Sequence, residues 1–146
     1  MSVVCYRGGI LAADALVSDV NDGCWLGFME KLHRSETSGI YGAVGHGEDV
    51  DAFFRWIDTE DPFPKLSSSI NALQVDLDGE VYFWTDGGRV RVTASPFLAI
   101  GEGREVALGA MDMGAGAELA CLVACKYVPS CGLPVSRMTL SEPQET

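Results

Sequence analysis

The chain has 146 residues, 47% hydrophobic and 21% charged, which predicts one folded domain with an apolar core and excludes global disorder. Acidic residues outnumber basic ones by 21 to 10, so the formal net charge is −11. This sign argues against nucleic acid and anionic membranes as partners, because both require a positive protein surface.

The number of cysteines and the hydropathy of the chain predict the cellular compartment of the protein. Five cysteines at irregular spacing indicate a reducing environment rather than a disulfide framework. The longest apolar runs are too short to span a bilayer, and no basic segment precedes an apolar one as in a secretory signal. We therefore expect a cytoplasmic protein with no membrane contact.

The first part of the chain is typical of short strands. Residues 2–7 and 9–14 are expected to form a hairpin through Gly8-Gly9, because glycine supplies the positive φ angles of a tight turn. The segment SDVNDG is a polar turn. Further extended segments are expected at residues 24–28, 29–34 and 40–45.

A helix is predicted over about residues 48–58. Val50, Phe53 and Ile57 recur at helical spacing, and acidic residues occupy the first turn, where the helix dipole favours them. The two prolines of DPFPK that follow cannot continue a helix, so the element ends before them.

The sequence of the second half of the chain predicts strands followed by helices. Asp-Gly turns in LDGE and TDGG divide a meander of three strands, and PFLAIG forms a further short strand. Two helices follow, separated at Gly114-Ala115-Gly116, and then a turn and a last strand. We predict a single α+β domain over residues 1–140, with packed sheets between outer helices, and a polar tail at 141–146.

Three stretches resemble the proteasome β-subunit family of N-terminal nucleophile (Ntn) hydrolases. They are RGGILAADALVS, then EKLHR with IYGAVGHGEDVDAF, and finally FLAIGEGREVALGAMDMGAGAELACLVACKYVPSCGLPV. Together they cover most of the chain in the family's order, and the chain looks closest to small proteasome-like proteins of phages and prophages. The resemblance implies a four-layer αββα sandwich.

The resemblance also implies a set of catalytic residues. Ser2 matches the nucleophile, whose hydroxyl and free α-amine become available when the preceding residue is removed. Lys31 matches the lysine beside the nucleophile, and Asp14 matches the carboxylate that pairs with it. Gly45 matches the glycine whose backbone N–H stabilises the oxyanion. The plainer interpretations are a structural ion pair for Asp14 and Lys31 and a turn glycine for Gly45.

Three positions depart from the family pattern. Glu102 stands in a Gly-Glu-Gly turn where the family usually has serine, and Val128 and Cys131 stand where it usually has aspartate and serine. In the family those groups orient the nucleophile and its amine. Retention of Met1 would also block the mechanism, because Ser2 would then have no free amine.

Two functions follow from this comparison. The departures favour an Ntn-fold protein with a partly degraded catalytic set, acting as a non-catalytic structural or assembly component of a phage particle or prophage. The alternative is an active amidohydrolase or peptidase that uses Ser2. Either protein is expected to form a homo-oligomeric ring or to bind other virion or assembly proteins, in the cytoplasm of a bacterial host or in a virion.

The residues predict no cofactor and no metal site. His33 and His46 have no serine or cysteine partner of the kind that a triad requires. Cys121 and Cys125 share a helix face and could bind a metal with Cys131, but the chain has no Cys-x2-Cys pair. Small apolar side chains in a helix interface are the favoured interpretation of these cysteines.

Overall fold

The computed structural model describes residues 2–18 and 25–141, which contain eleven strands and three helices. The elements follow the predicted order, from strands to a helix, then strands, two helices and a strand. Met1, Cys24, most of the predicted turn at 18–23 and the tail from residue 142 lie outside the described residues.

The first sheet brings the two ends of the chain together. In spatial order its strands are β10 (Phe97–Ile100), β1 (Val4–Arg7), β2 (Ile10–Ala13) and β11 (Ser136–Thr139). All neighbours are antiparallel. The predicted hairpin is confirmed, since Arg7 pairs with Ile10 across Gly8-Gly9.

The second sheet is a meander of five antiparallel strands. They are β5 (Leu32–Ser35), β6 (Gly39–Val44), β7 (Asn71–Val75), β8 (Val81–Thr85) and β9 (Gly88–Val92). The three strands predicted from the Asp-Gly turns are β7, β8 and β9. Two short strands, β3 (Leu16–Ser18) and β4 (Trp25–Phe28), pair separately.

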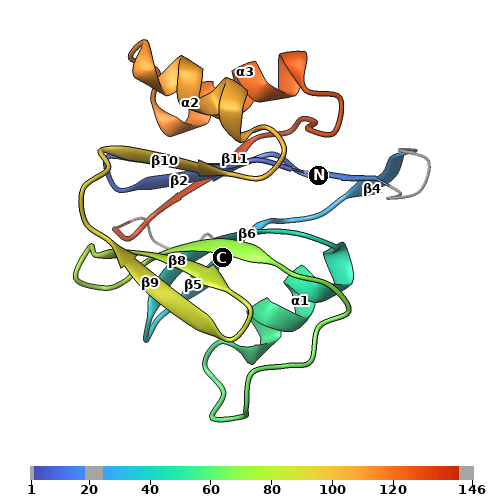
Figure 1. The fold of residues 1–146 in the computed structure, drawn as a ribbon, viewed down its shortest axis with the longest axis vertical. Coiled ribbons are helices and arrows are strands. Elements are labelled where there is room, and N and C mark those ends of the chain that lie inside the picture. The colour runs from blue at the N-terminus through green and yellow to red at the C-terminus, as the bar shows by residue number, and fades with distance from the viewer. Residues whose placement is uncertain (1, 19–24, 142–146) are drawn as a thin grey trace.

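The helices cover the outer faces of the two sheets. They are α1 (Gly47–Trp56), α2 (Arg104–Asp112) and α3 (Ala117–Tyr127). Figure 1 shows α2 and α3 on the first sheet and α1 beneath the second, which gives the predicted four-layer αββα order. Within the described residues, no helix is long and apolar enough to cross a membrane.

Three apolar cores fill the spaces between the four layers. The core under α2 and α3 consists largely of small side chains, among them Ala107, Ala120 and Ala124. The core between the sheets contains Val4, Leu11 and other branched residues. The core under α1 is aromatic. Its central ring is the fully buried Phe53, which lies 6.0 Å from the Tyr41 ring and 5.6 Å from the Trp84 ring between centroids.

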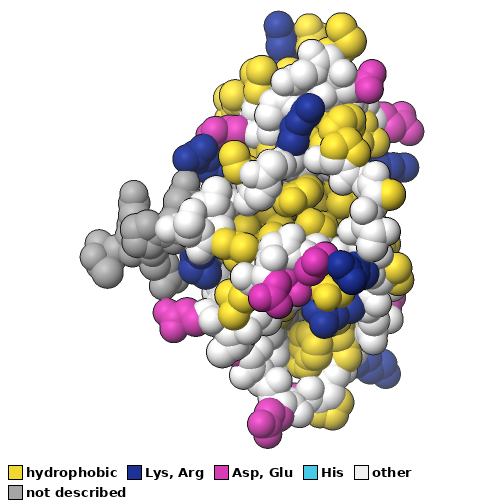
Figure 2. All heavy atoms as spheres, turned by 90° about the vertical axis from the view of Figure 1, so that its left-hand side faces the viewer, with side chains coloured by type: hydrophobic (Ala, Val, Ile, Leu, Met, Phe, Trp, Pro, Cys, Tyr) yellow, Lys and Arg dark blue, Asp and Glu magenta, His cyan; other side chains and the backbone are white. Residues whose placement is uncertain are grey.

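The apolar interior reaches the surface at one end of the sandwich. Figure 2 faces the side that lies on the left of Figure 1, and it shows apolar side chains gathered at mid-height with acidic and basic side chains beside them. Separately, an exposed ion pair joins Arg91 Nη2 of β9 to Glu80 Oε2 at 2.8 Å.

Candidate functional site

A buried polar cluster lies at the start of the chain, and its centre is the ammonium group of Lys31. Ser2, Asp14 and Lys31 are 2%, 0% and 3% exposed. Lys31 Nζ lies 2.6 Å from Ser2 Oγ, 2.8 Å from Asp14 Oδ1 and 2.7 Å from the carbonyl oxygen of Leu16. An ammonium group has three hydrogens, so these three acceptors satisfy it completely.

The Asp14 carboxylate is held by backbone groups as well as by the lysine. Its Oδ1 accepts from the N–H of Val3 at 3.1 Å, and its Oδ2 accepts from the N–H of Gly132 at 3.0 Å and of Leu16 at 3.4 Å. Since a buried charge is costly unless it is paired and hydrogen-bonded, this arrangement makes a fully buried carboxylate tolerable.

Both sheets contribute to the cluster. Ser2 lies just before β1 and Asp14 just after β2, and the pairing of Val4 with Ala13 brings these two strand ends together. Lys31 lies just before β5 in the second sheet. The three residues that the resemblance singled out, 29 positions apart at most, therefore meet where the hairpin faces the second sheet.

Gly45, the fourth predicted residue, lies between β6 and α1. Its φ of 145° favours glycine, and a Cβ there would come within 3.1 Å of the Ile70 side chain. Gly45 lines a groove of about 770 Å³, and Gly101 and Glu102 line the same groove. Its remaining lining is mainly apolar and comes from both sheets: Val44, Ser69, Asn71, Leu73, Phe83, Val90, Val92, Leu98, Ala99, Ile100 and Arg104.

The Gly-Glu-Gly turn packs directly against the backbone of Ser2. The N–H of Gly103 donates to the Ser2 carbonyl at 3.1 Å. Gly101 has a φ of 96°, and a Cβ on it would lie only 2.2 Å from that same carbonyl oxygen, so only glycine fits there. Glu102 is exposed between these two glycines, and its Oε2 accepts from the Ser130 hydroxyl at 2.7 Å.

Sequence reasoning missed Ser130. It lies between Val128 and Cys131, the two positions where the sequence departs from the family pattern. A serine hydroxyl one or two residues from those positions was the sequence feature that could have indicated its role. Val128 caps α3 and packs against the core below the helices. Cys131 is buried, and burial raises the pKa of its thiol to about 12, so it stays protonated at neutral pH.

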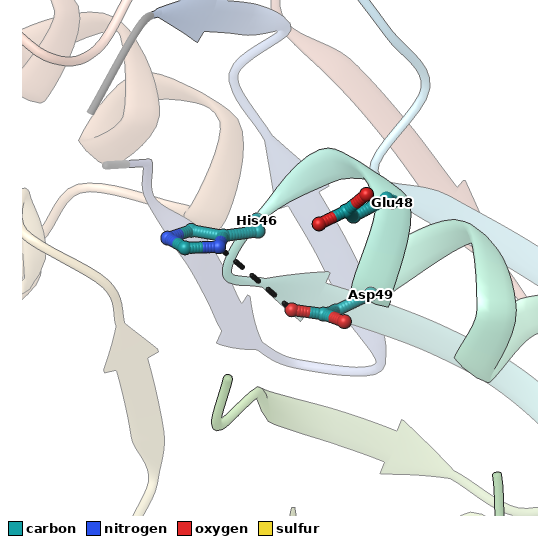
Figure 3. Close-up of side chains that lie close together, drawn as sticks. All are labelled: His46, Glu48 and Asp49. Carbon is teal, nitrogen blue, oxygen red and sulfur yellow. Dashed lines mark ion pairs between the residues drawn. The ribbon is translucent and has the colours of Figure 1, made fainter. Parts of the chain in front are cut away.

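A second polar cluster lies at the start of α1. His46, Glu48 and Asp49 are close enough to one another to share a metal ion (Figure 3). His46 Nδ1 lies 3.9 Å from Asp49 Oδ2, but Asp49 already accepts from the N–H groups of Ser67 and Ser68 at 2.8 and 3.1 Å and from both hydroxyls. The buried carboxylate therefore holds the 67–68 loop, a structural role.

Comparison with solved structures identifies the fold. The chain is similar to the Thiobacillus denitrificans protein BPH in complex with epoxomicin, with 18% identity and a TM-score of 0.65 over 97% of this chain and 99% of that one. It is also similar to eukaryotic HslV from Trypanosoma brucei, at 15% identity and a TM-score of 0.63 over 94% and 98% of the two chains.

A third similar structure is a mutant of Anbu from Hyphomicrobium sp. strain MC1, with 14% identity and a TM-score of 0.63 over 94% of this chain and 80% of that one. Comparisons with protein-family models and with curated proteins give no match. Identities of 14–18% establish the architecture and leave the activity to be argued from the site. The chain has the fold of the proteasome-like Ntn hydrolases.

Proposed function

We propose that this chain is an N-terminal nucleophile hydrolase that cleaves amide bonds, with Ser2 as nucleophile after removal of Met1. The observation that carries the proposal is the 2.6 Å contact between Lys31 Nζ and Ser2 Oγ inside a cluster that excludes water. A buried ammonium in this position stabilises negative charge on the serine oxygen as it attacks a carbonyl carbon.

Lys31 does not serve as the base in this arrangement. Its three hydrogens are all donated, one of them to Ser2 Oγ, so the protonated amine cannot accept the serine proton. The α-amine of a processed Ser2 is the nearest alternative, and its usual pKa of roughly 7.7–8.0 suits proton transfer near neutral pH. This supports a mechanism that depends on the loss of Met1.

The reaction proceeds in two balanced steps. Ser2 Oγ bonds to the carbonyl carbon and its proton passes through the α-amine to the departing nitrogen, so the amide C–N bond breaks and an ester remains. Water then attacks the carbonyl carbon of the ester, and one of its protons passes through the α-amine to Ser2 Oγ as the C–O bond to the serine breaks, which releases the carboxylic acid and restores the hydroxyl. We assign oxyanion stabilisation to the backbone N–H of Gly45, which lies in the groove beside α1.

The second candidate is a non-catalytic structural or assembly role in a phage particle or prophage. Val128 and Cys131 favour it, because neither an apolar side chain nor a protonated buried thiol can orient an amine. In that case the Lys31–Asp14 pair at 2.8 Å would only fasten the hairpin to the second sheet.

Covalent labelling separates the two candidates. Epoxomicin, present in the complex of the structurally similar BPH, is the probe. After intact-mass measurement and N-terminal sequencing establish that Ser2 is the first residue, we expect one epoxomicin adduct per chain. Ser2→Ala should lose the adduct completely, because it removes the attacking oxygen, and Ser95→Ala is the matched control on an exposed serine.

The outcomes are distinct. Full labelling of Ser2→Ala would end the assignment of Ser2 as nucleophile. Absence of labelling and of amide hydrolysis in the Ser2-terminated protein would favour the non-catalytic role. A search for the protein in purified particles would then follow.

A further inference from the structure

Glu102 is the residue of the site that the mechanism above leaves unused. It replaces a neutral hydroxyl expected from the family with a carboxylate, in a turn whose two glycines both contact the Ser2 carbonyl. The flanking contacts, 3.1 Å from Gly103 N to Ser2 O and the close approach of Gly101, fix the turn against the first residues of the chain.

The Glu102 carboxylate is oriented by a second group. The Ser130 hydroxyl donates to its Oε2 at 2.7 Å, so the side chain is tied to the loop that follows α3. A hydrogen bond with the chain's α-amino group lowers the pKa of Glu102, and the Ser130 hydrogen bond lowers it further. The carboxylate is therefore ionised at neutral pH, and it belongs to the turn that packs against the Ser2 backbone.

Removal of Met1 transfers the α-amino group to Ser2, one residue along the chain. One residue spans about 3.5 Å, which is within the range that a glutamate side chain covers by changing rotamer. The anchored Ser2 carbonyl restricts where this new amine can lie. The amine of processed Ser2 is therefore within reach of the Glu102–Ser130 pair.

We propose that Glu102, held by Ser130, binds the α-ammonium group of processed Ser2 and sets the pH at which this amine becomes a base. The inference rests on the proposed function and deepens it, because it names the group that controls the base. In this role Glu102 and Ser130 replace the orienting side chains lost at Val128 and Cys131.

The other ionisable groups around Ser2 are expected to affect the pKa of its α-amine less than Glu102 does. Asp14 and Lys31 form an ion pair at 2.8 Å, so their opposite charges largely cancel at the amine. The Cys131 thiol is neutral because burial raises its pKa to about 12. Arg104 directs a guanidinium N–H to the Gly101 carbonyl at 3.0 Å from the solvent side, where water screens its charge.

The negative charge of Glu102 determines the direction in which the pKa of the Ser2 α-amine shifts. A carboxylate stabilises the protonated amine, so it raises the pKa of the base and moves the onset of activity to higher pH. Glu102→Gln keeps the size and a hydrogen-bond acceptor but removes the charge. We expect the amine of this variant to titrate about one pH unit lower than in the wild type.

The experiment measures the titration of the Ser2 α-amine directly, by acylation, and also through the pH dependence of catalysis. Ser2-terminated protein is treated with an acylating reagent over a range of pH, and mass spectrometry of the N-terminal peptide gives the midpoint at which the α-amine becomes reactive. Glu102→Gln should shift this midpoint, and the acidic limb of kcat/KM, down by about one pH unit. The matched control is Glu105→Gln, an exposed glutamate one helical turn along the chain.

Identical amine midpoints in wild type and Glu102→Gln would overturn the inference, and so would an equal shift in Glu105→Gln. The acylation readout needs no turnover. A shifted midpoint in an inactive protein would therefore support the role of Glu102 while refuting the hydrolase function. An unshifted midpoint in an active protein would support the hydrolase function and refute the role of Glu102.

Discussion

At the residue scale, the ammonium group of Lys31 links the two sheets and also contacts the hydroxyl of Ser2. Lys31 is fixed by three acceptors from the hairpin side: Ser2 Oγ, Asp14 Oδ1 and the Leu16 carbonyl. Its burial would be unfavourable without them. The contacts proposed to serve catalysis therefore also stabilise the fold.

Removal of the lysine charge should be strongly destabilising. Lys31→Met leaves Asp14 buried without its cation, and we expect a loss of about 3–5 kcal/mol in the free energy of unfolding. Urea unfolding followed by circular dichroism measures it, with the exposed Lys65→Met as control. A loss below about 1 kcal/mol would mean that the backbone N–H groups of Val3 and Gly132 satisfy the carboxylate by themselves.

At the element scale, α1 is held by its apolar face and by its first turn. Its apolar face packs through Phe53 into an aromatic core, and its first turn places Asp49 against the 67–68 loop. Burial by itself would raise the pKa of Asp49, but the hydrogen bonds from Ser67 and Ser68 outweigh it and lower the pKa below 3.8. This loop leads into β7, so Asp49 connects helix and sheet.

We expect Asp49→Asn to lose about 1–3 kcal/mol of stability at neutral pH, because an amide cannot accept all of these hydrogen bonds. The folded pKa lies below the ordinary 3.8, so the carboxylate's contribution is complete above that value and disappears as the pH falls through the folded pKa. Unfolding measured at neutral pH and well below pH 3.8 tests both parts. A difference between wild type and variant that persists in acid would contradict this account.

The matched control for this prediction is Asp51→Asn on the same helix. Asp51 pairs with Arg55 at 3.0 Å, but both side chains are exposed, at 54% and 81%. Exposed pairs contribute little, so the control should change stability by less than about 0.5 kcal/mol.

At the scale of the whole molecule, charge and apolar exposure act in opposite directions. The net charge of −11 makes copies of the chain repel one another. The outer layer nevertheless exposes Leu119 and Leu122 of α3, 54% and 42% accessible, and Met113 after α2, 87% accessible. Leu119 and Leu122 are three positions apart and share one helix face. We propose that this face takes part in a homo-oligomer.

Self-association through apolar faces should strengthen as salt is added, because screening weakens the repulsion between like charges. Sedimentation equilibrium at low and high salt measures it. Leu119→Asn should weaken association, and Leu77→Asn, an equally exposed leucine at 57% in the β7–β8 turn, should leave it unchanged. Association that weakens with salt would instead indicate attraction between charged groups.

Local signals predicted much of the secondary structure. The Gly8-Gly9 and Asp-Gly turns and the spacing of Val50, Phe53 and Ile57 act over a few residues, and the hairpin, meander and helix are present as expected. The helix occupies Gly47–Trp56 rather than 48–58, because Ile57 caps it and Asp58 adopts a φ of 75°. The identity of the candidate site residues was predicted from the family resemblance rather than from local signals.

By itself, the sequence determined the elements, the acidic charge and the presence of Ser2, Asp14 and Lys31, since turn chemistry and residue type are local properties. Only the tertiary structure decided how these residues meet. The pairing of β11 with β2 brings the Gly132 N–H to Asp14, 118 positions away, and the turn after β10 brings Glu102 and Ser130 to the chain start. Such contacts depend on which apolar faces pack together, and no short stretch of sequence encodes that choice.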